Sequence, residues 1–212
     1  MNKIMWMAKK MLPEYVFDTA QLEGNPMTFP EVQTLLDGIT VGGHKISDAQ
    51  QILNLREAWQ KAFMYANKNT LIINKELYLD IHNSVAKEEA MEWGVFRSGS
   101  VGIAGTTSYS APNAACLDAI FMKDLPSILS LKNIEECAIR LFLWGAYNQF
   151  FWDGNKRTSR IIANIILMHH DVGIFNIKAK DIVVFNTLMV DFYNTNDMKH
   201  IFPFLLNNCI VK

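Results

Sequence analysis

The sequence has 212 residues, of which 50% are hydrophobic and 19% charged, and 20 basic against 21 acidic side chains leave a formal net charge of -1. This composition excludes a disordered or collagen-like chain, and the balanced charge argues against a dedicated nucleic-acid-binding protein. Three widely spaced cysteines, Cys116, Cys137 and Cys209, form neither a metal-binding pattern nor a complete disulfide set. We therefore expect one domain over residues 1–212, in a reducing cytoplasm and with no membrane span.

Apolar residues at helical spacing predict a mostly α-helical fold. Thr28 with Glu31 forms a capping-box pattern ahead of a helix that ends near Gly38. Ser47 with Gln50 forms a second such pattern ahead of a longer helix. The other expected helices span 74–87, 112–129, 133–148 and 156–170.

Three further segments bear on the architecture. The runs 139–147 and 161–168 are apolar almost all round, which predicts a central, fully surrounded pair of helices. The stretch 182–190 fits a strand or a helix, and we favour a helix because no strand partner lies nearby. The glycine-rich stretch 95–109 predicts a short β-hairpin.

The segment between the two central helices places cations where a helix N-terminus already carries positive charge. Its turn and first helical turn contain Asp153, Gly154, Asn155, Lys156, Arg157 and Arg160. Free backbone N–H groups, a glycine that permits close approach and two guanidinium groups together predict a phosphate site. The aspartate can supply the single carboxylate that Mg²⁺ needs when phosphates provide other oxygens. An exposed basic turn paired with carboxylates elsewhere is the alternative.

Residues 149–160 resemble the signature of the Fic family, H-x-F-x-(D/E)-G-N-(G/K)-R-x-x-R, and match each fixed position after the first. The stretch 19–24 resembles the family's inhibitory motif, (S/T)-x-x-x-E-(G/N), and 94–110 resembles its target-binding flap. The resemblance implies a Fic-type helical domain with a small β-hairpin flap and an inhibitory segment over 1–26. It also implies transfer of AMP from ATP to a hydroxyl side chain of a target protein.

The resemblance further implies a role for each matched residue of the signature. Asp153 would hold Mg²⁺, Gly154 and Asn155 would form an anion hole, Arg157 would bind the nucleotide phosphates and Arg160 would meet the γ-phosphate. These assignments make ATP and Mg²⁺ the expected ligands.

The inhibitory motif and the flap have implied roles as well. Glu23, flanked by Thr19 and Gly24, would place its carboxylate against Arg160 and so exclude the productive pose of ATP. The target-binding backbone would be that of Val101, Gly102, Ile103, Ala104 and Gly105. Fic proteins with such an inhibitory helix are often dimeric, which makes a homodimer an expectation by resemblance.

The sequence departs from the signature at its first residue, where Gln149 replaces the histidine that serves the family as general base. A glutamine amide cannot accept a proton near neutral pH, and loss of a positioned base costs about 10²- to 10⁴-fold in rate. Lys156 is shared with the related Doc branch, whose members resemble kinases. We favour a weak, auto-inhibited adenylyltransferase; a nucleotide-binding or scaffold pseudoenzyme and a Doc-like protein kinase remain open.

Overall fold

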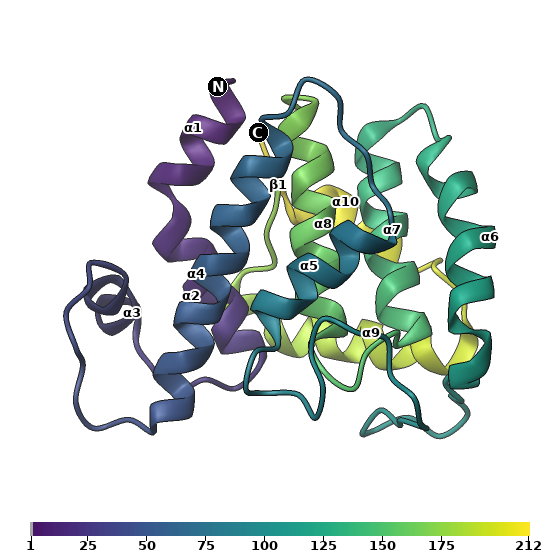
Figure 1. Ribbon diagram of the computed structural model, residues 1–212, viewed down its shortest axis with the longest axis horizontal. Helices are drawn as coiled ribbons and strands as arrows, with labels where there is room; N and C mark the ends of the chain where they lie inside the picture. The colour runs from purple at the N-terminus through teal and green to yellow at the C-terminus, as the bar shows by residue number, and fades with distance from the viewer. Residues whose placement is uncertain (1) are drawn as a thin grey trace.

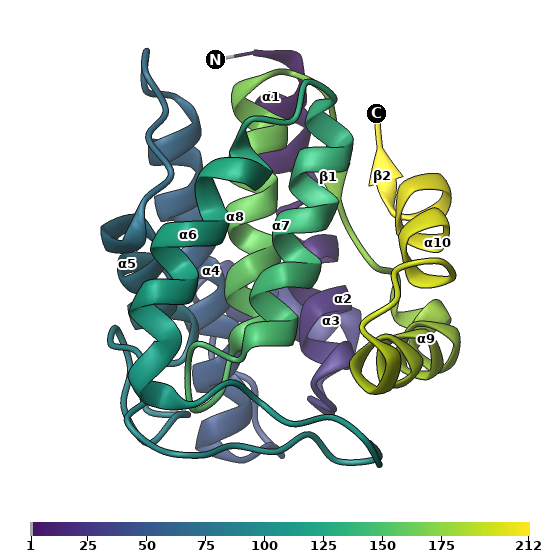
Figure 2. The ribbon, with the colours of Figure 1, turned by 90° about the vertical axis from the view of Figure 1, so that its right-hand side faces the viewer.

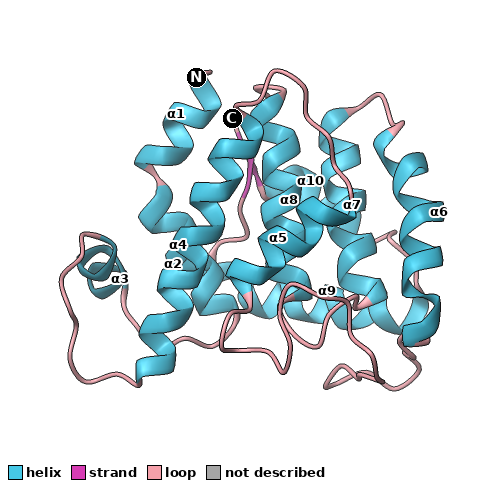
Figure 3. Cartoon of the chain, viewed as in Figure 1, coloured by secondary structure: helices cyan, strands magenta, loops and turns pink. Residues whose placement is uncertain are grey.

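The computed structural model describes residues 2–212, which are mostly helical (Figures 1 and 3). The α-helices are α1 (Lys3–Lys10), α2 (Leu12–Leu22), α3 (Phe29–Leu36), α4 (Ile46–Ala66), α5 (Lys75–Val85), α6 (Leu117–Leu129), α7 (Ile134–Asn148), α8 (Asn155–His169), α9 (Ile182–Thr195) and α10 (Ile201–Asn208). Short 3₁₀ helices span Ala114–Cys116 and Ala179–Asp181, and the strands are β1 (Ile174–Phe175) and β2 (Ile210–Val211). No described helix is both long and apolar enough to cross a bilayer.

Helix α8 lies at the centre of the molecule, packed against α4, α5 and, most extensively, α7 (Figures 1 and 2). The predicted central pair is therefore confirmed. The two helices approach closely at Gly145, where an added Cβ would clash with the side chain of Ser159. This packing holds the α7–α8 turn, which contains the signature residues, against a rigid support.

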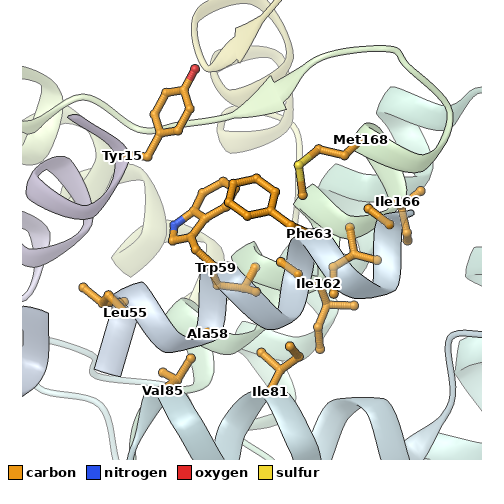
Figure 4. Packing of buried hydrophobic residues seen from close by; sticks show 14 of the residues in the cluster. Tyr15, Leu55, Ala58, Trp59, Phe63, Ile81, Val85, Ile162, Ile166 and Met168 are labelled. Carbon is orange, nitrogen blue, oxygen red and sulfur yellow. The ribbon is translucent and has the colours of Figure 1, made fainter. Parts of the chain in front are cut away.

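The core beside α8 joins the N-terminal helices to the rest of the fold (Figure 4). Trp59 of α4 is 2% exposed and stacks on Tyr15 of α2 with a ring-centroid distance of 5.6 Å. Phe63 of α4 and Ile162 and Ile166 of α8 belong to the same buried cluster. Burial of these large side chains, each worth roughly 1.5–3 kcal/mol, anchors α2 to α4.

Several local predictions hold in the structure. The backbone N–H of Thr28 donates to Glu31 Oε2 at 2.7 Å, as the capping-box pattern predicts. The ambiguous stretch 182–190 lies in α9, where Val183 and Val184 are 73% and 51% exposed. Because these two β-branched residues face solvent, the apolar residues of this stretch do not form one clear helical stripe in the sequence.

Two local predictions are wrong. Helix α4 begins at Ile46, before Ser47, because the carboxylate of Asp48 accepts the backbone N–H of Lys45 at 3.1 Å. The stretch 95–109 forms no strand and runs as an irregular loop. The strands β1 and β2, which are separated in sequence by α9 and α10, pair antiparallel instead, with Ile174 opposite Val211.

Candidate active site

The α7–α8 turn is shaped by two left-handed residues. Gln149 ends α7 with φ 47°, and Gly154 precedes α8 with φ 74°. A Cβ at Gly154 would lie 3.3 Å from Val85 and Ala86 at the end of α5, so glycine suits both the conformation and the space. The turn thus places the N-terminus of α8 beside a small cavity that Gln149 and Gly154 help to line.

Asn155 closes this turn through its side chain. Its Oδ1 accepts the backbone N–H of Phe151 at 2.9 Å, and its Nδ2 donates to the Phe151 carbonyl and to Gln149 Oε1. Gln149 Nε2 donates to the Ala146 carbonyl at 2.6 Å. The Gln149 amide is therefore held at the edge of the site by a bond on each side.

Both arginines of the signature are buried. Arg157 is 2% exposed, and although burial alone would lower its pKa, the nearby carboxylates of Glu23, Glu89 and Asp153 raise it. Burial lowers the pKa of Arg160 to about 10, so it remains a cation near neutral pH. Arg157 Nε and Arg160 Nη2 are buried without a hydrogen-bond partner among residues 2–212.

Glu23 does not pair with Arg160 as the resemblance implied. Its carboxylate lies 3.9 Å from Lys156 Nζ and 4.0 Å from Arg157 Nε, in the first turn of α8. Helix α2 ends at Leu22, and this end brings Glu23 one turn short of Arg160 along α8. Glu23 therefore does contact the basic residues at the start of α8, but these are Lys156 and Arg157 and not Arg160.

The turn that carries Glu23 is held from both sides. Gly24 adopts φ 81°, and Gln21 Nε2 donates to the carbonyls of Asn25 and Met27. Asn25 Nδ2 in turn donates to Gln51 Oε1 of α4 at 3.1 Å. Thr19, the first residue of the motif, is buried and bonds within α2, to the carbonyl four residues earlier.

A small cavity lies at the start of α8. Its volume is about 50 Å³, and it is lined by Glu23, Gln149, Asp153, Gly154, Asn155, Lys156 and Arg157. Sites for small molecules usually have roughly 300–1,000 Å³, so this space has room for water and not for a nucleotide. A larger hollow of about 500 Å³ lies between α1 and α4, away from the signature residues.

Asp153 is the acidic residue at the mouth of this cavity. Its side chain is 59% exposed, and Oδ1 accepts the backbone N–H of Gly154 at 2.5 Å. No group of three or more His, Cys, Asp or Glu side chains in the described part of the chain is placed to hold a metal. One exposed carboxylate fits Mg²⁺ when phosphate oxygens and water supply the remaining ligands, which is how this ion is commonly bound.

The predicted flap lies at the same end of the molecule as the α7–α8 turn (Figures 1 and 2). Val101 and Ile103 are partly buried, and the intervening and following residues 102, 104 and 105 are exposed. Asn194 of α9 anchors the loop, because its Oδ1 accepts the backbone N–H groups of 107 and 108 at 2.8 and 3.0 Å. The loop is thus tethered by side chains in place of strand pairing.

Arg97 ties this loop to the turn, a role that the sequence analysis missed. Its guanidinium donates to the carbonyls of Gln149, Gly99 and Pro112 at 2.5–2.6 Å, and it is 2% exposed. Burial lowers its pKa from the ordinary arginine value. The sequence signal that could have indicated this role is that Arg97 is a single cation beside a Gly/Ser-rich stretch.

His82 supports the turn from α5 and was also missed. The Gly94 N–H donates to its Nδ1, so Nε2 carries the proton and donates to the Asp153 carbonyl, both at 3.0 Å. The ring stacks on Phe151 with centroids 3.6 Å apart. Burial lowers the pKa of His82 to about 4. No motif surrounds this residue in the sequence.

Acid should therefore destabilise the fold through His82. Its folded pKa of about 4 lies below the unfolded value of 6.5, so the unfolded chain binds the proton more tightly. The stabilisation is complete above pH 6.5 and is lost as pH falls toward 4, by up to ~3 kcal/mol. Between pH 7 and 4.5, denaturant titrations should show a larger loss of unfolding free energy for wild type than for His82→Gln.

The matched control is His200→Gln, which removes an exposed histidine. This variant should follow the wild-type pH dependence. Equal losses in wild type and His82→Gln would contradict the prediction.

Residues 72–167 match the family model described as the Fic/DOC family. This segment, which is somewhat less than half of the chain, is similar to the Fic/DOC family. The signature, the loop 94–110 and α8 up to residue 167 fall inside the matched segment, whereas Glu23 lies outside it.

Curated relatives of this chain carry the name protein adenylyltransferase Fic. The proteins of Aedes aegypti and Culex quinquefasciatus are 28% and 26% identical over 169 and 167 residues. Each alignment covers 76% of this chain and 33% of the relative. The chain thus spans about a third of the length of the curated relatives it matches.

Solved structures share the fold. Fic-1 (aa134–508) from C. elegans superimposes with a TM-score of 0.82 at 17% identity, over 98% of this chain and 63% of that one. A Fic domain containing signaling protein from Bacteroides thetaiotaomicron gives a TM-score of 0.75 at 18% identity, over 94% and 81%. The mostly helical Fic-type fold that the resemblance implied is confirmed.

Proposed function

We propose that this Fic domain binds ATP at the start of α8 and transfers AMP to a hydroxyl side chain of a target protein, slowly and under restraint from Glu23. The observation that carries the proposal is the pair of buried guanidinium groups with unpartnered N–H atoms, on Arg157 and Arg160. A buried, unsatisfied cationic donor is costly, and a phosphate oxygen is its natural partner. The free N–H groups of the helix N-terminus attract the same ligand.

The remaining signature residues complete the proposed site. The backbone N–H of Asn155 would be open to a phosphate, and that of Gly154 would become open once Asp153 releases it. Lys156 would add positive charge at the rim. Mg²⁺, when bound by Asp153 and the nucleotide, would neutralise part of the phosphate charge. The loop with residues 101–105 would bind a target segment through its backbone.

The reaction defines what Gln149 lacks. The hydroxyl oxygen bonds to the α-phosphorus, the α–β phosphoanhydride bond breaks, pyrophosphate leaves, and the hydroxyl proton must pass to a base. The Gln149 amide already donates to the Ala146 carbonyl and accepts from Asn155, and it has no basic nitrogen. Because Gln149 cannot accept the hydroxyl proton, the proposed site would bind ATP but transfer AMP slowly.

A second candidate follows from the same residue: a nucleotide-binding or scaffold pseudoenzyme that transfers nothing. A Doc-like kinase is the third, on account of Lys156. A homodimer belongs to the proposal through the family resemblance alone, and a cytoplasmic location through the widely spaced cysteines of the sequence.

The test uses the full chain with Mg²⁺ and ATP labelled at either the α- or the γ-phosphate, with binding measured by calorimetry. We expect ATP binding and slow incorporation of the α-label. ATP binding without incorporation of either label, in the wild type and in Glu23→Gly, favours the pseudoenzyme. Incorporation of the γ-label alone favours the kinase. Absence of ATP binding in every variant, including Glu23→Gly, would refute all three.

A further inference from the structure

The shortest ionic contact of Arg157 is with a residue outside the signature. Its Nη1 donates to Glu89 Oε2 at 2.6 Å, across 68 positions of sequence. Glu89 lies in the turn after α5, and its side chain is 14% exposed. This contact is much closer than those of Arg157 with Glu23 or Asp153.

The Glu89 carboxylate is fixed by two amides of α4. Gln51 Nε2 donates to its Oε2 at 2.9 Å, and Asn54 Nδ2 donates to its Oε1 at 3.0 Å. With Arg157, three donors therefore converge on the two carboxylate oxygens. An acceptor held in this way has one orientation, and it imposes one orientation on the guanidinium.

The side-chain amides of Asn54 and Gln51 are themselves oriented by further hydrogen bonds. Asn54 is 1% exposed, its Oδ1 accepts from Gln50 Nε2 at 2.8 Å, and its Nδ2 also donates to the Lys87 carbonyl at 2.7 Å. Gln51 Oε1 accepts from Asn25 Nδ2 at 3.1 Å. In both amides the oxygen has its own donor, so the NH₂ group faces Glu89.

The bond to Glu89 leaves the other edge of the guanidinium free. Nε lies 4.0 Å from Glu23 and Nη2 lies 3.5 Å from Asp153, and both of these acidic residues line the cavity. The Nε–Nη2 edge therefore faces the cavity, and Nε has no hydrogen-bond partner within residues 2–212. This edge presents two parallel N–H groups, the fork that binds a phosphate bidentately.

We propose that Glu89 is a positioning residue for the nucleotide: by holding Nη1 of Arg157, it directs the Nε–Nη2 edge at a phosphate of ATP. The inference rests on the proposed function, because the ligand of that edge is the nucleotide. The opposite role, in which Glu89 competes with phosphate for Arg157, predicts the opposite change in affinity on its removal.

The test measures ATP affinity by calorimetry in the Glu23→Gly background, where the cavity is relieved of its acidic occupant. Glu89→Gln removes the charge and one acceptor oxygen, so the three donors can no longer all be satisfied. We expect ATP binding to weaken on the order of ten- to hundredfold, the usual cost of losing an orienting partner. Glu88→Gln is the matched control, because it removes an exposed carboxylate at the adjacent position.

A double-mutant cycle separates positioning from general damage. Arg157→Lys keeps the charge and loses the fork, so it should itself weaken ATP binding. Added to Arg157→Lys, Glu89→Gln should cost less than threefold, because its effect passes through the fork. Thermal unfolding of each variant checks that the fold is retained, and Glu89→Asp replaces Glu89→Gln if the latter unfolds.

Unchanged or tighter ATP binding in Glu89→Gln would overturn the inference and leave the proposed function standing. An equal loss in the Arg157→Lys background would also overturn it, because Glu89 would then act independently of the fork. If the Glu23→Gly parent itself binds no ATP, the proposed function fails, and this inference fails with it.

Discussion

Replacing Gln149 with histidine is expected to raise the rate of AMP transfer by about 10²- to 10⁴-fold. The position suits the exchange, because Gln149 lies on the cavity wall and adopts φ 47°, a left-handed conformation in which histidine is comparatively common. The Gln149 side chain donates to the Ala146 carbonyl. A histidine that donates Nδ1–H to this carbonyl would keep Nε2 free to accept the hydroxyl proton.

The measurement is incorporation of α-labelled phosphate into protein, with Mg²⁺ present and Glu23→Gly in both chains, so that restraint does not mask the gain. Gln149→Asn is the control, because it keeps an amide and supplies no base. The label should remain at the slow rate with asparagine and rise with histidine. If histidine leaves the rate unchanged while ATP still binds, the missing base does not limit the reaction.

Substitution of Glu23 by glycine is expected to tighten ATP binding by roughly 5- to 150-fold, the usual range for coupling between an inhibitory contact and a ligand. The Glu23 carboxylate lies 3.9 Å from Lys156 and 4.0 Å from Arg157, so it takes the charge that a phosphate would neutralise. It also lines a cavity of about 50 Å³. Its removal relieves both the competition and the lack of space.

Calorimetric titration with ATP and Mg²⁺ measures this change. Glu23→Gln serves as the matched variant, since it removes the charge and keeps the volume. An affinity for Glu23→Gln between those of wild type and Glu23→Gly would apportion the effect between charge and space. Equal affinity in all three chains would show that Glu23 does not restrain the site.

Many features of this protein are set by residues close together in sequence. The Thr28–Glu31 cap joins residues three apart, and the turn into α8 follows from Gly154 and Asn155, which are adjacent. A helix hydrogen bond spans four residues, and an apolar stripe repeats every three or four, so such elements can be predicted from a short window. The fold class and the basic cluster of α8 were accordingly predictable, as the family match bears out for the fold.

Competition between neighbouring signals limits even local prediction. The Ser47–Gln50 pattern predicted the cap of α4, but in the structure the carboxylate of Asp48 accepts the backbone N–H of Lys45. Val101 and Ile103 alternate as in a strand, yet their loop pairs with no strand. Arg97 and Asn194 hold it instead, through side-chain hydrogen bonds to its backbone. A pattern in sequence cannot tell which acceptor or partner will be nearest.

The partners within the candidate site were decided by tertiary structure. Arg157 meets Glu89 across 68 positions, and His82 meets Asp153 across 71. Which carboxylate reaches which arginine depends on where α2 ends and how α4 and α5 pack on α8. Glu23 accordingly lies near Lys156 and Arg157, one helical turn before Arg160. The sequence by itself determined the helices and the cationic turn, because these depend on short-range spacing. Only the packed fold decided which charges meet, because ion pairs act over a few ångströms between segments that the chain order leaves far apart.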